Sequence, residues 1–497
     1  MSIKVKFYTI LSIILTIGCT IKKEIPADIE FTVVSKLRDS IPAVEVSFDY
    51  TSDKNGLIKL RYENNSWGNN NLFNCIQDLQ VLPKPENIEF NKDSSFITIK
   101  TTPDLLSSIN YKIIQDYKGL PLNQHRYRPM MDKNYFHVLG MRLFMIPEGV
   151  FESESSKANI KINYKRASEN EFFHSSFGKE SVQNIEVNRE DLYASFFVGG
   201  DYRRYSFIHQ KDTIYFITRG DWKSFTDQDI LNQLKQTISA QKEFWNDSRK
   251  GDFSVTLIPT YETWYSVGGS GFSNSFISFA SNNEKVTLTQ MKWLYNHELF
   301  HKWVGRTIQI ENDVEQYWFS EGFTDYYSYK LMLKNDFLNV SEYIKILNKD
   351  VIIPHYKDPV NTVPNSKLTF NEYWSNYAKY MKLPYRRGLL YAFLLDNQIK
   401  KQSNYAQSLD NLMIDLFQLS LKDEALRLNQ KIFTQNLVKY LNHSKVKTDF
   451  ERYILEGNLI DFQNELPDGL SIESKNNIPL LKLDSENYIE ITNRLKF

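Results

Sequence analysis

The sequence has little cysteine and no net charge, and these two absences exclude several classes of protein. Only 2 of its 497 residues are cysteines, too few for a disulfide framework, so stability must come from size and packing. Lysine plus arginine and aspartate plus glutamate both number 60. That balance gives no electrostatic case for a nucleic-acid partner or an anionic membrane surface. The sequence also has no internal repeat, no CxxC pair and no phosphate-binding glycine-rich loop, and no obligate protein partner is evident.

An HExxH pattern at His297-Glu298-Leu299-Phe300-His301 is the clearest chemical signal. Residues four apart share one face of a helix, so both imidazoles can reach a single ion. Glu298 stands beside the first histidine and is placed to act as general base on a water that the metal activates. With 8 histidines in the chain, the pattern would occur by chance in roughly one such chain in a hundred. The surrounding sequence must therefore decide whether this pattern marks a metal site.

An acid further along the chain supplies the third ligand that a catalytic zinc ion needs. Glu321 follows His301 after 19 residues, which is enough to finish one helix, turn and begin an antiparallel one. Asp325 comes four residues later and faces the same side, where it can accept the free N–H of a ligand histidine. The alternative is an amphipathic helix pair with a chance histidine pair, which these two acids disfavour. The sequence predicts one Zn²⁺ per chain, bound by His297, His301 and Glu321.

These segments resemble a known family. HELFHKW at residues 297–303 and YWFSEGFTDYY at residues 317–327 resemble the gluzincin metallopeptidases, and most of all the glycyl aminopeptidase family. The resemblance implies the same zinc ligands and the same general base. A third segment, YRRGLLYAFLLD at residues 385–396, is similar to the family's Tyr-x-Lys-Gly segment and implies that Tyr385 donates to the oxyanion. The alternative is that Tyr385 only caps a helix, as one of 30 tyrosines.

A glycine-rich segment, YSVGGSGFSNS at residues 265–275, follows an expected buried strand at residues 253–259. In the family the matching segment is an edge strand along which the substrate backbone lies. The resemblance therefore implies a substrate-binding role for four consecutive residues, Gly268, Gly269, Ser270 and Gly271. Glycines suit this role because no side chain projects between peptide and sheet. The alternative is a flexible loop rich in glycine and serine.

Gly271 departs from the family pattern, because the family has a glutamate at this position. That acid is expected to hold the free α-amine of the substrate, so its absence leaves amino-terminal specificity open. Glu262 or Glu315 could supply another acid. Endopeptidase or carboxyl-side specificity is the alternative within the same chemistry.

The first residues have the pattern of a bacterial lipoprotein signal. Lys4 and Lys6 precede an apolar stretch at residues 7–17, which is too short to span a membrane comfortably. Gly18 and Cys19 then resemble the end of a lipobox. We expect a signal peptide at residues 1–18, a lipid anchor on Cys19, and a place in the bacterial cell envelope, on its periplasmic face or at the cell surface. An ordinary cleaved signal and an uncleaved anchor are the alternatives.

The length predicts a multidomain α+β protein. Short alternating runs broken by turn residues predict an N-terminal β-sandwich domain at residues 19–189, with strands near residues 29–34, 44–50, 57–62, 96–101 and 158–164. A strand and helix pattern predicts a thermolysin-like zinc catalytic domain at residues 190–345, including a helix over residues 227–245. The remainder, residues 346–497, is expected to be an α-helical domain and tail.

Together these features predict a zinc-dependent peptidase that hydrolyses peptides or proteins, with aminopeptidase-like activity. An endopeptidase of the same fold is one alternative, and a surface-binding lipoprotein without catalysis is the other. The preferred side chain, the oligomeric state, the membrane leaflet and the physiological substrate do not follow from the sequence.

Overall fold

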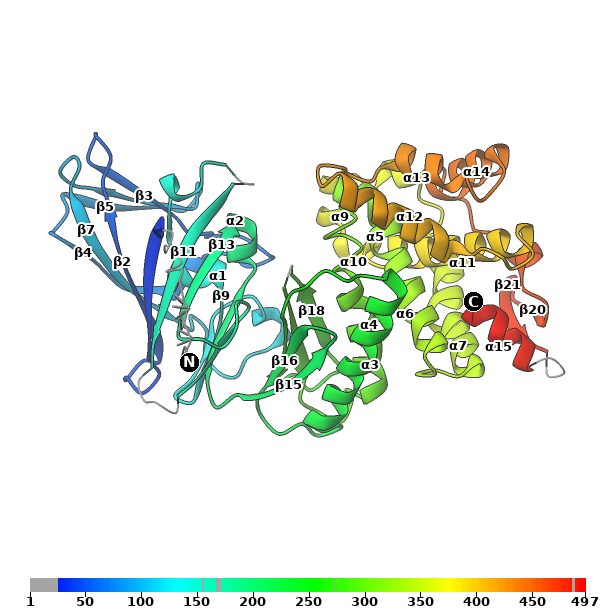
Figure 1. Ribbon diagram of the computed structural model, residues 1–497, viewed down its shortest axis with the longest axis horizontal. Helices are drawn as coiled ribbons and strands as arrows, with labels where there is room; N and C mark the ends of the chain where they lie inside the picture. Colours follow the sequence, from blue (N-terminus) through cyan, green and yellow to red (C-terminus); the bar gives the residue numbers. More distant parts are fainter. Residues whose placement is uncertain (1–25, 154–155, 167–170, 273, 485–487) are drawn as a thin grey trace, which may run out of the picture.

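In a computed structural model, the chain forms three successive regions, which Figure 1 shows side by side. β-sheets come first, a mixed α/β region lies in the middle, and helices follow to the C-terminus. This confirms the expected multidomain α+β architecture. The structure describes residues 26–153, 156–166, 171–272, 274–484 and 488–497. The expected signal peptide and Cys19 lie outside the described residues.

Three sheets build the N-terminal region. The six-stranded sheet has the order β13-β11-β1-β2-β7-β4, and the two four-stranded sheets have the orders β10-β3-β6-β5 and β12-β14-β9-β8. All five strands expected from alternation are confirmed, because alternate residues along them are buried. The strands of this region are β1 (Ile29–Lys36), β2 (Ala43–Thr51), β3 (Leu57–Arg61), β4 (Ile76–Leu82), β5 (Asn87–Asn91), β6 (Phe96–Lys100), β7 (Leu106–Ile114), β8 (Met130–Met131), β9 (Tyr135–Leu139), β10 (Ile146–Pro147), β11 (Lys157–Lys165), β12 (Phe172–Ser175), β13 (Val182–Asn188) and β14 (Phe196–Gly200). Short helices α1 (Gly140–Leu143) and α2 (Arg189–Tyr193) lie among them.

β14 pairs with β9 and β12, so the N-terminal sheets continue past residue 189, where the sequence placed the boundary. The next sheet has the order β15-β16-β17-β19-β18, in which β16, β17 and β19 run parallel. Every residue of β17 is buried, as expected for a central parallel strand covered on both faces. The strands are β15 (Arg203–His209), β16 (Asp212–Thr218), β17 (Phe253–Thr260), β18 (Val267–Gly271) and β19 (Ser275–Ser281).

The two faces of this catalytic sheet have different neighbours. Side chains on one face join the core of the N-terminal sheets, while those on the other pack against α3 (Asp227–Trp245) and α4 (Leu288–Phe300). The helix expected over residues 227–245 is confirmed as α3, which begins with a capping box formed by Thr226 and Asp229. The sheet therefore lies as a middle layer between the N-terminal domain and the helices of the site.

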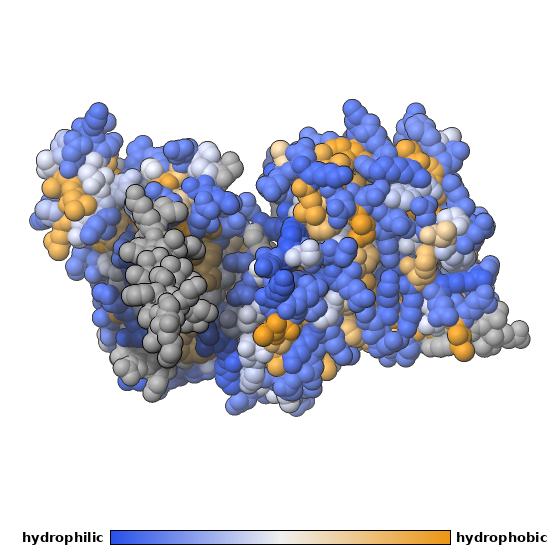
Figure 2. All heavy atoms as spheres, viewed as in Figure 1, coloured by the Kyte–Doolittle hydropathy of each residue, from blue (hydrophilic) through white to orange (hydrophobic). Residues whose placement is uncertain are grey.

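The last region is mainly helical and has its own core. Among the described residues its helices are α5 (Asp313–Ser320), α6 (Gly322–Lys334), α7 (Val340–Ile346), α8 (Ile353–Lys357), α9 (Phe370–Ser375), α10 (Tyr377–Tyr380), α11 (Leu383–Gln402), α12 (Leu409–Lys422), α13 (Gln430–Leu437), α14 (His443–Phe450) and α15 (Tyr488–Lys496). A hairpin of β20 (Leu470–Lys475) and β21 (Ile478–Leu483) was not expected from the sequence. In the part of the chain that the structure describes, no helix has both the length and the apolar character to cross a membrane. Figure 2 shows mostly hydrophilic side chains on the visible face of the catalytic and helical regions.

Candidate zinc centre

The HExxH residues lie at the end of α4. A capping box of Thr287 and Gln290 begins this helix, and His301 follows its last residue with backbone angles that are still helical. His297 and His301 therefore project from one face, with ring centroids 4.9 Å apart. The spacing predicted this arrangement, and the structure places both imidazoles as expected.

Glu321 joins α5 to α6 and reaches the same point. Its N–H donates to the Tyr317 carbonyl, and its own carbonyl accepts from the Asp325 N–H, so the chain stays helical across the junction. α6 packs closely against α11, because two glycines meet where the helices cross. A Cβ atom on Gly388 would lie 1.8 Å from the Trp318 carbonyl oxygen, and one on Gly322 would lie 2.4 Å from the Cα atom of Gly388. This close approach brings Tyr385, at the start of α11, beside Glu321.

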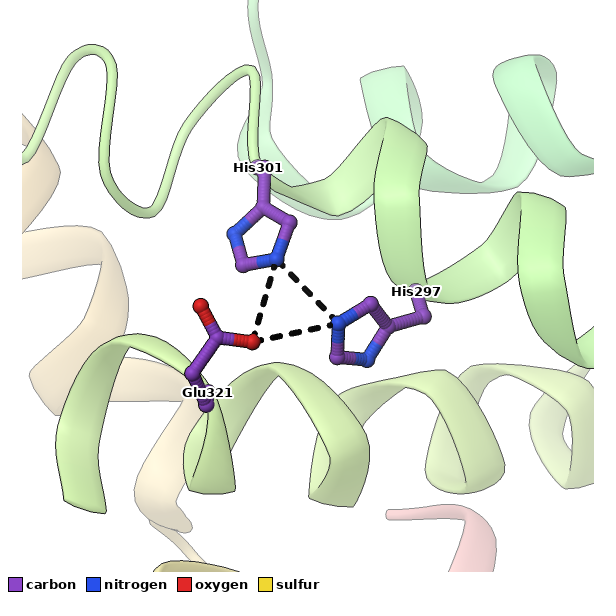
Figure 3. A group of neighbouring side chains, drawn as sticks. All are labelled: His297, His301 and Glu321. Atoms are coloured by element: carbon purple, nitrogen blue, oxygen red, sulfur yellow. Dashed lines mark hydrogen bonds and ion pairs between the residues drawn. The ribbon is translucent and has the colours of Figure 1, made fainter. Parts of the chain in front are cut away.

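Three ligand atoms converge in the geometry that zinc requires (Figure 3). The Nε2 atoms of His297 and His301 are 3.2 Å apart. The Oε2 atom of Glu321 lies 3.4 Å from the first and 3.5 Å from the second. Two ligands bound about 2.1 Å from one tetrahedral zinc ion lie ~3.4 Å from each other. The spacing and the two-imidazole, one-carboxylate donor set both fit Zn²⁺.

The remaining ring nitrogens have partners that orient the two imidazoles. The Nδ1 atom of His297 lies 2.8 Å from Asp325 Oδ1, and the Nδ1 atom of His301 lies 3.1 Å from the carbonyl oxygen of Val304. Both partners accept, so Nδ1 carries the proton in each ring and Nε2 is left to bind a metal. The structure thus places Asp325 in the orienting position that the sequence predicted.

The electrostatics of the site suit a cation. Burial alone would lower the pKa of His297, but Asp325, Glu321 and Glu298 outweigh it and raise that pKa to about 10. Burial raises the pKa of Glu298, and the two imidazoles offset part of this effect. A raised pKa is the change that a carboxylate needs in order to accept and return a proton near neutral pH. Burial and the nearby Glu321 raise the pKa of Tyr385 well above its usual value, so its O–H stays available as a donor.

β18 is the edge strand of the catalytic sheet, as the resemblance implied. It pairs with β19 on one side, and Gly268, Gly269, Ser270 and Gly271 are all partly exposed along it. A Cβ atom on Gly271 would lie 3.2 Å from the carbonyl oxygen of Glu298, so this strand runs directly beside the HExxH helix. An extended peptide has an open edge to pair with at this point.

A cavity of about 460 Å³ joins the zinc ligands to the edge strand. Of the described residues that line it, only Glu298 and Glu321 are acids. Neither Glu262 nor Glu315 lines it, so neither replaces the acid that is missing at Gly271. A guanidinium occupies this region instead: Arg306 donates to the carbonyl oxygen of Gly271 at 3.4 Å and pairs with Glu190 at 2.7 Å.

Sequence reasoning did not predict several other lining residues, among them Trp67, Arg306 and Ser320. Trp67 enters from the N-terminal domain, Arg306 comes from the turn after α4, and Ser320 precedes Glu321. The Ser320 hydroxyl is buried and has no hydrogen-bond partner among the described residues. Ser320 adjoins a predicted ligand and could have been suspected for that reason. No local pattern points to Trp67, because it lies far away in the sequence.

Residues 290–384 match the family described as M61 glycyl aminopeptidase. This stretch contains His297, Glu298, His301 and Glu321. Over this segment the chain is similar to the glycyl-aminopeptidase-like gluzincins. The chain is accordingly a hydrolase that acts on peptide bonds, and its His-His-Glu group fits the zinc-dependent, aminopeptidase-like chemistry of that family.

Solved structures resemble this chain in fold. An aminopeptidase N family protein from Idiomarina loihiensis has a TM-score of 0.72 at 15% identity, over 90% of this chain and 79% of that one. An M1 zinc metallopeptidase from Deinococcus radiodurans has a TM-score of 0.49 at 13% identity, over 88% of this chain and 95% of that one. The first of these shows that the two proteins share the same overall fold. No curated protein matches the chain by sequence.

Proposed function

We propose that this protein hydrolyses peptides with one zinc ion per chain, held by His297, His301 and Glu321. The observation that carries the proposal is the set of three ligand atoms, spaced 3.2 to 3.5 Å apart, with both outer ring nitrogens already engaged. A zinc ion bound there would lower the pKa of a water and polarise the scissile carbonyl. The remaining chemistry belongs to side chains of this protein.

Glu298 acts as the general base. It lines the cavity beside the ligands, and burial has raised its pKa. It takes the proton of the attacking water and returns it to the leaving amine. Tyr385 donates its O–H to the developing oxyanion, since it lines the same cavity and stays protonated. The substrate backbone pairs with the edge of β18 and so fixes the scissile bond between these two groups.

The test of the mechanism is Glu298→Gln. This variant should keep the zinc content and the unfolding temperature of the wild type, yet lose activity by about 10²- to 10⁴-fold. Glu315→Gln is the matched control, because Glu315 is an exposed acid that does not line the cavity. A near wild-type rate for Glu298→Gln would overturn the assignment.

A second specificity, that of an endopeptidase, is favoured by Gly271. The cavity offers no carboxylate for a free α-amine beyond Glu298 and Glu321, and Arg306 adds a positive charge beside Gly271. One peptide with a free amino terminus and its acetylated form distinguish the two specificities. An aminopeptidase should lose most activity on acetylation, whereas an endopeptidase should keep it.

We also propose that the protein is a lipoprotein of the bacterial cell envelope, anchored through Cys19. The support is the sequence alone, in which Lys4, Lys6, an apolar stretch and Gly18 precede that cysteine. Labelling with an alkyne fatty acid in a bacterial host tests it. The wild type and Cys75→Ser should take up the label, and Cys19→Ser should not. Equal labelling of Cys19→Ser would contradict the anchor.

A further inference from the structure

The N-terminal domain contributes an aromatic wall to the active-site cavity. Trp67 lies between β3 and β4, is 42% exposed, and lines the cavity together with the edge strand and the zinc ligands. Its place in the cavity suggests a binding role.

The turn that carries Trp67 is strained and firmly held. Trp67 has a positive φ of 53°, a backbone conformation that non-glycine residues rarely adopt. Ser66 and Asn69 exchange two backbone hydrogen bonds across the turn, of 2.9 and 3.0 Å. Strain of this kind persists only where the surrounding structure imposes it.

A buried arginine, Arg142, anchors the residue next to Trp67. Arg142 is fully buried and donates to the Ser66 hydroxyl at 2.8 Å and to the Tyr127 carbonyl oxygen at 3.1 Å. The Tyr127 ring in turn meets the Trp67 ring edge-on, with centroids 4.9 Å apart. The Tyr127 hydroxyl lies 2.6 Å from the Ser270 hydroxyl on the edge strand. Arg142 therefore fixes Trp67 relative to the strand on which the substrate lies.

The side chains near Trp67 determine which kind of substrate side chain the cavity can accept. The same cavity is lined by Phe272, whose ring centroid is 5.9 Å from that of Trp67, and by Ile310 and Tyr317. These side chains give the cavity an apolar portion beside its many polar groups, and the Trp67 and Phe272 rings lie together within it. Aromatic rings gain most from such surroundings, because they combine buried area with edge and face contacts.

We propose that Trp67 is a specificity-determining residue of the peptidase, and that it selects an aromatic side chain next to the scissile bond. This inference rests on the proposed function, since it names the substrate class of the same cavity. Recognition then comes from a side chain and not from a terminal amine, which agrees with the lack of an acid at Gly271. Acetylated peptides are accordingly suitable ligands for the test.

Binding without turnover provides the test. The probes are tetra-alanine peptides, acetylated and amidated at their ends, with one Phe, Leu, Asp or Gly at each position in turn. Their affinities are measured by calorimetry on the full-length, zinc-loaded Glu298→Gln protein. At one position Phe should bind about tenfold more tightly than Gly.

Substitutions then show whether the preference for Phe over Gly depends on Trp67. Adding Trp67→Ala should remove the Phe-to-Gly ratio, and Trp67→Phe should restore much of it. Trp374→Ala is the matched control, because Trp374 is 46% exposed on α9 and does not line the cavity. It should leave the ratio unchanged, and unfolding temperatures show whether each variant is folded.

The outcomes separate the two proposals. If Trp67→Ala keeps the ratio, if no peptide shows one, or if no peptide binds, the specificity inference is overturned. If the ratio depends on Trp67 but the zinc-loaded wild type hydrolyses none of the peptides, the inference holds and the proposed peptidase function fails.

Discussion

The Nδ1 atom of His297 lies 2.8 Å from the Oδ1 atom of Asp325, one turn along α6 from the ligand Glu321. The start of α6 therefore supplies both a proposed metal ligand, at its N-cap, and the group that orients another proposed ligand. Because Glu321 and Asp325 are only four residues apart, a short stretch of sequence was enough to predict both positions.

Asp325→Asn should weaken zinc binding by about 10- to 100-fold, because an amide no longer fixes the tautomer of His297 or raises its basicity. Competition with a chelator of known affinity measures the effect. Asp336→Asn changes an exposed acid just beyond the same helix and should leave the affinity unchanged. Equal affinities for wild type and Asp325→Asn would show that the orienting contact contributes nothing.

Tyr385→Phe should lower kcat by about 100-fold and leave KM nearly unchanged, because the lost O–H donates only when the oxyanion develops. Zinc content should stay at the wild-type level. Steady-state kinetics on one peptide substrate measure the effect, with Tyr377→Phe, an exposed tyrosine on α10, as the control. A change confined to KM would instead assign Tyr385 to substrate binding.

Gly388→Ala should lower the free energy of unfolding by about 3 kcal/mol, because its methyl group would overlap the Trp318 carbonyl of α5 and crowd Gly322 of α6, and so push α11 away from both helices. The same movement would carry Tyr385 away from Glu321 and reduce activity in any protein that still folds. Urea unfolding gives the stability. Gly251→Ala introduces a methyl group with nothing within 4 Å and should be close to neutral. If both variants unfold alike, the helix crossing tolerates more space than the structure indicates.

Stability should depend on Asp247 below neutral pH. Burial opposes its ionisation, but bonds from Arg249 and the Trp303 indole outweigh this and lower the pKa of Asp247 from 3.8 to about 2. Because the folded-state pKa is lower, the stabilisation is full above about pH 4 and is lost as the pH falls through 2. Urea unfolding of wild type and Asp247→Asn should therefore differ at pH 6 and converge toward pH 2. A difference that is constant over this range would exclude the ionised carboxylate as its source.

The parts of the site that the sequence predicted are those set by local spacing. His297 and His301 share a helix face, Glu321 and Asp325 share the next, and strands such as β1 and β2 show alternation that the structure confirms. Such patterns depend on helix and strand periods that neighbouring residues fix between themselves.

The parts that could not be predicted depend on contacts between distant segments. Trp67 reaches the cavity because Arg142 holds its turn, and Arg306 lies beside Gly271 because Glu190 of α2 pairs with it. Neither contact leaves a periodic trace in the sequence. The sequence showed that Gly271 replaces the family's glutamate, but it did not show that Arg306 lies beside this glycine.

The core of the N-terminal sheets does not stop at the catalytic sheet. It includes Ile217, Ile258, Ile277 and Phe279, which come from β16, β17 and β19. Cutting the chain after Gly200 would expose these side chains to water, at about 1.5–3 kcal/mol each. The two walls of the substrate cavity thus belong to one folding unit. A chimera between related peptidases must therefore exchange the N-terminal domain and the five-stranded sheet together. A foreign N-terminal domain would replace Trp67, and it would also disturb the sheet against which α4 packs.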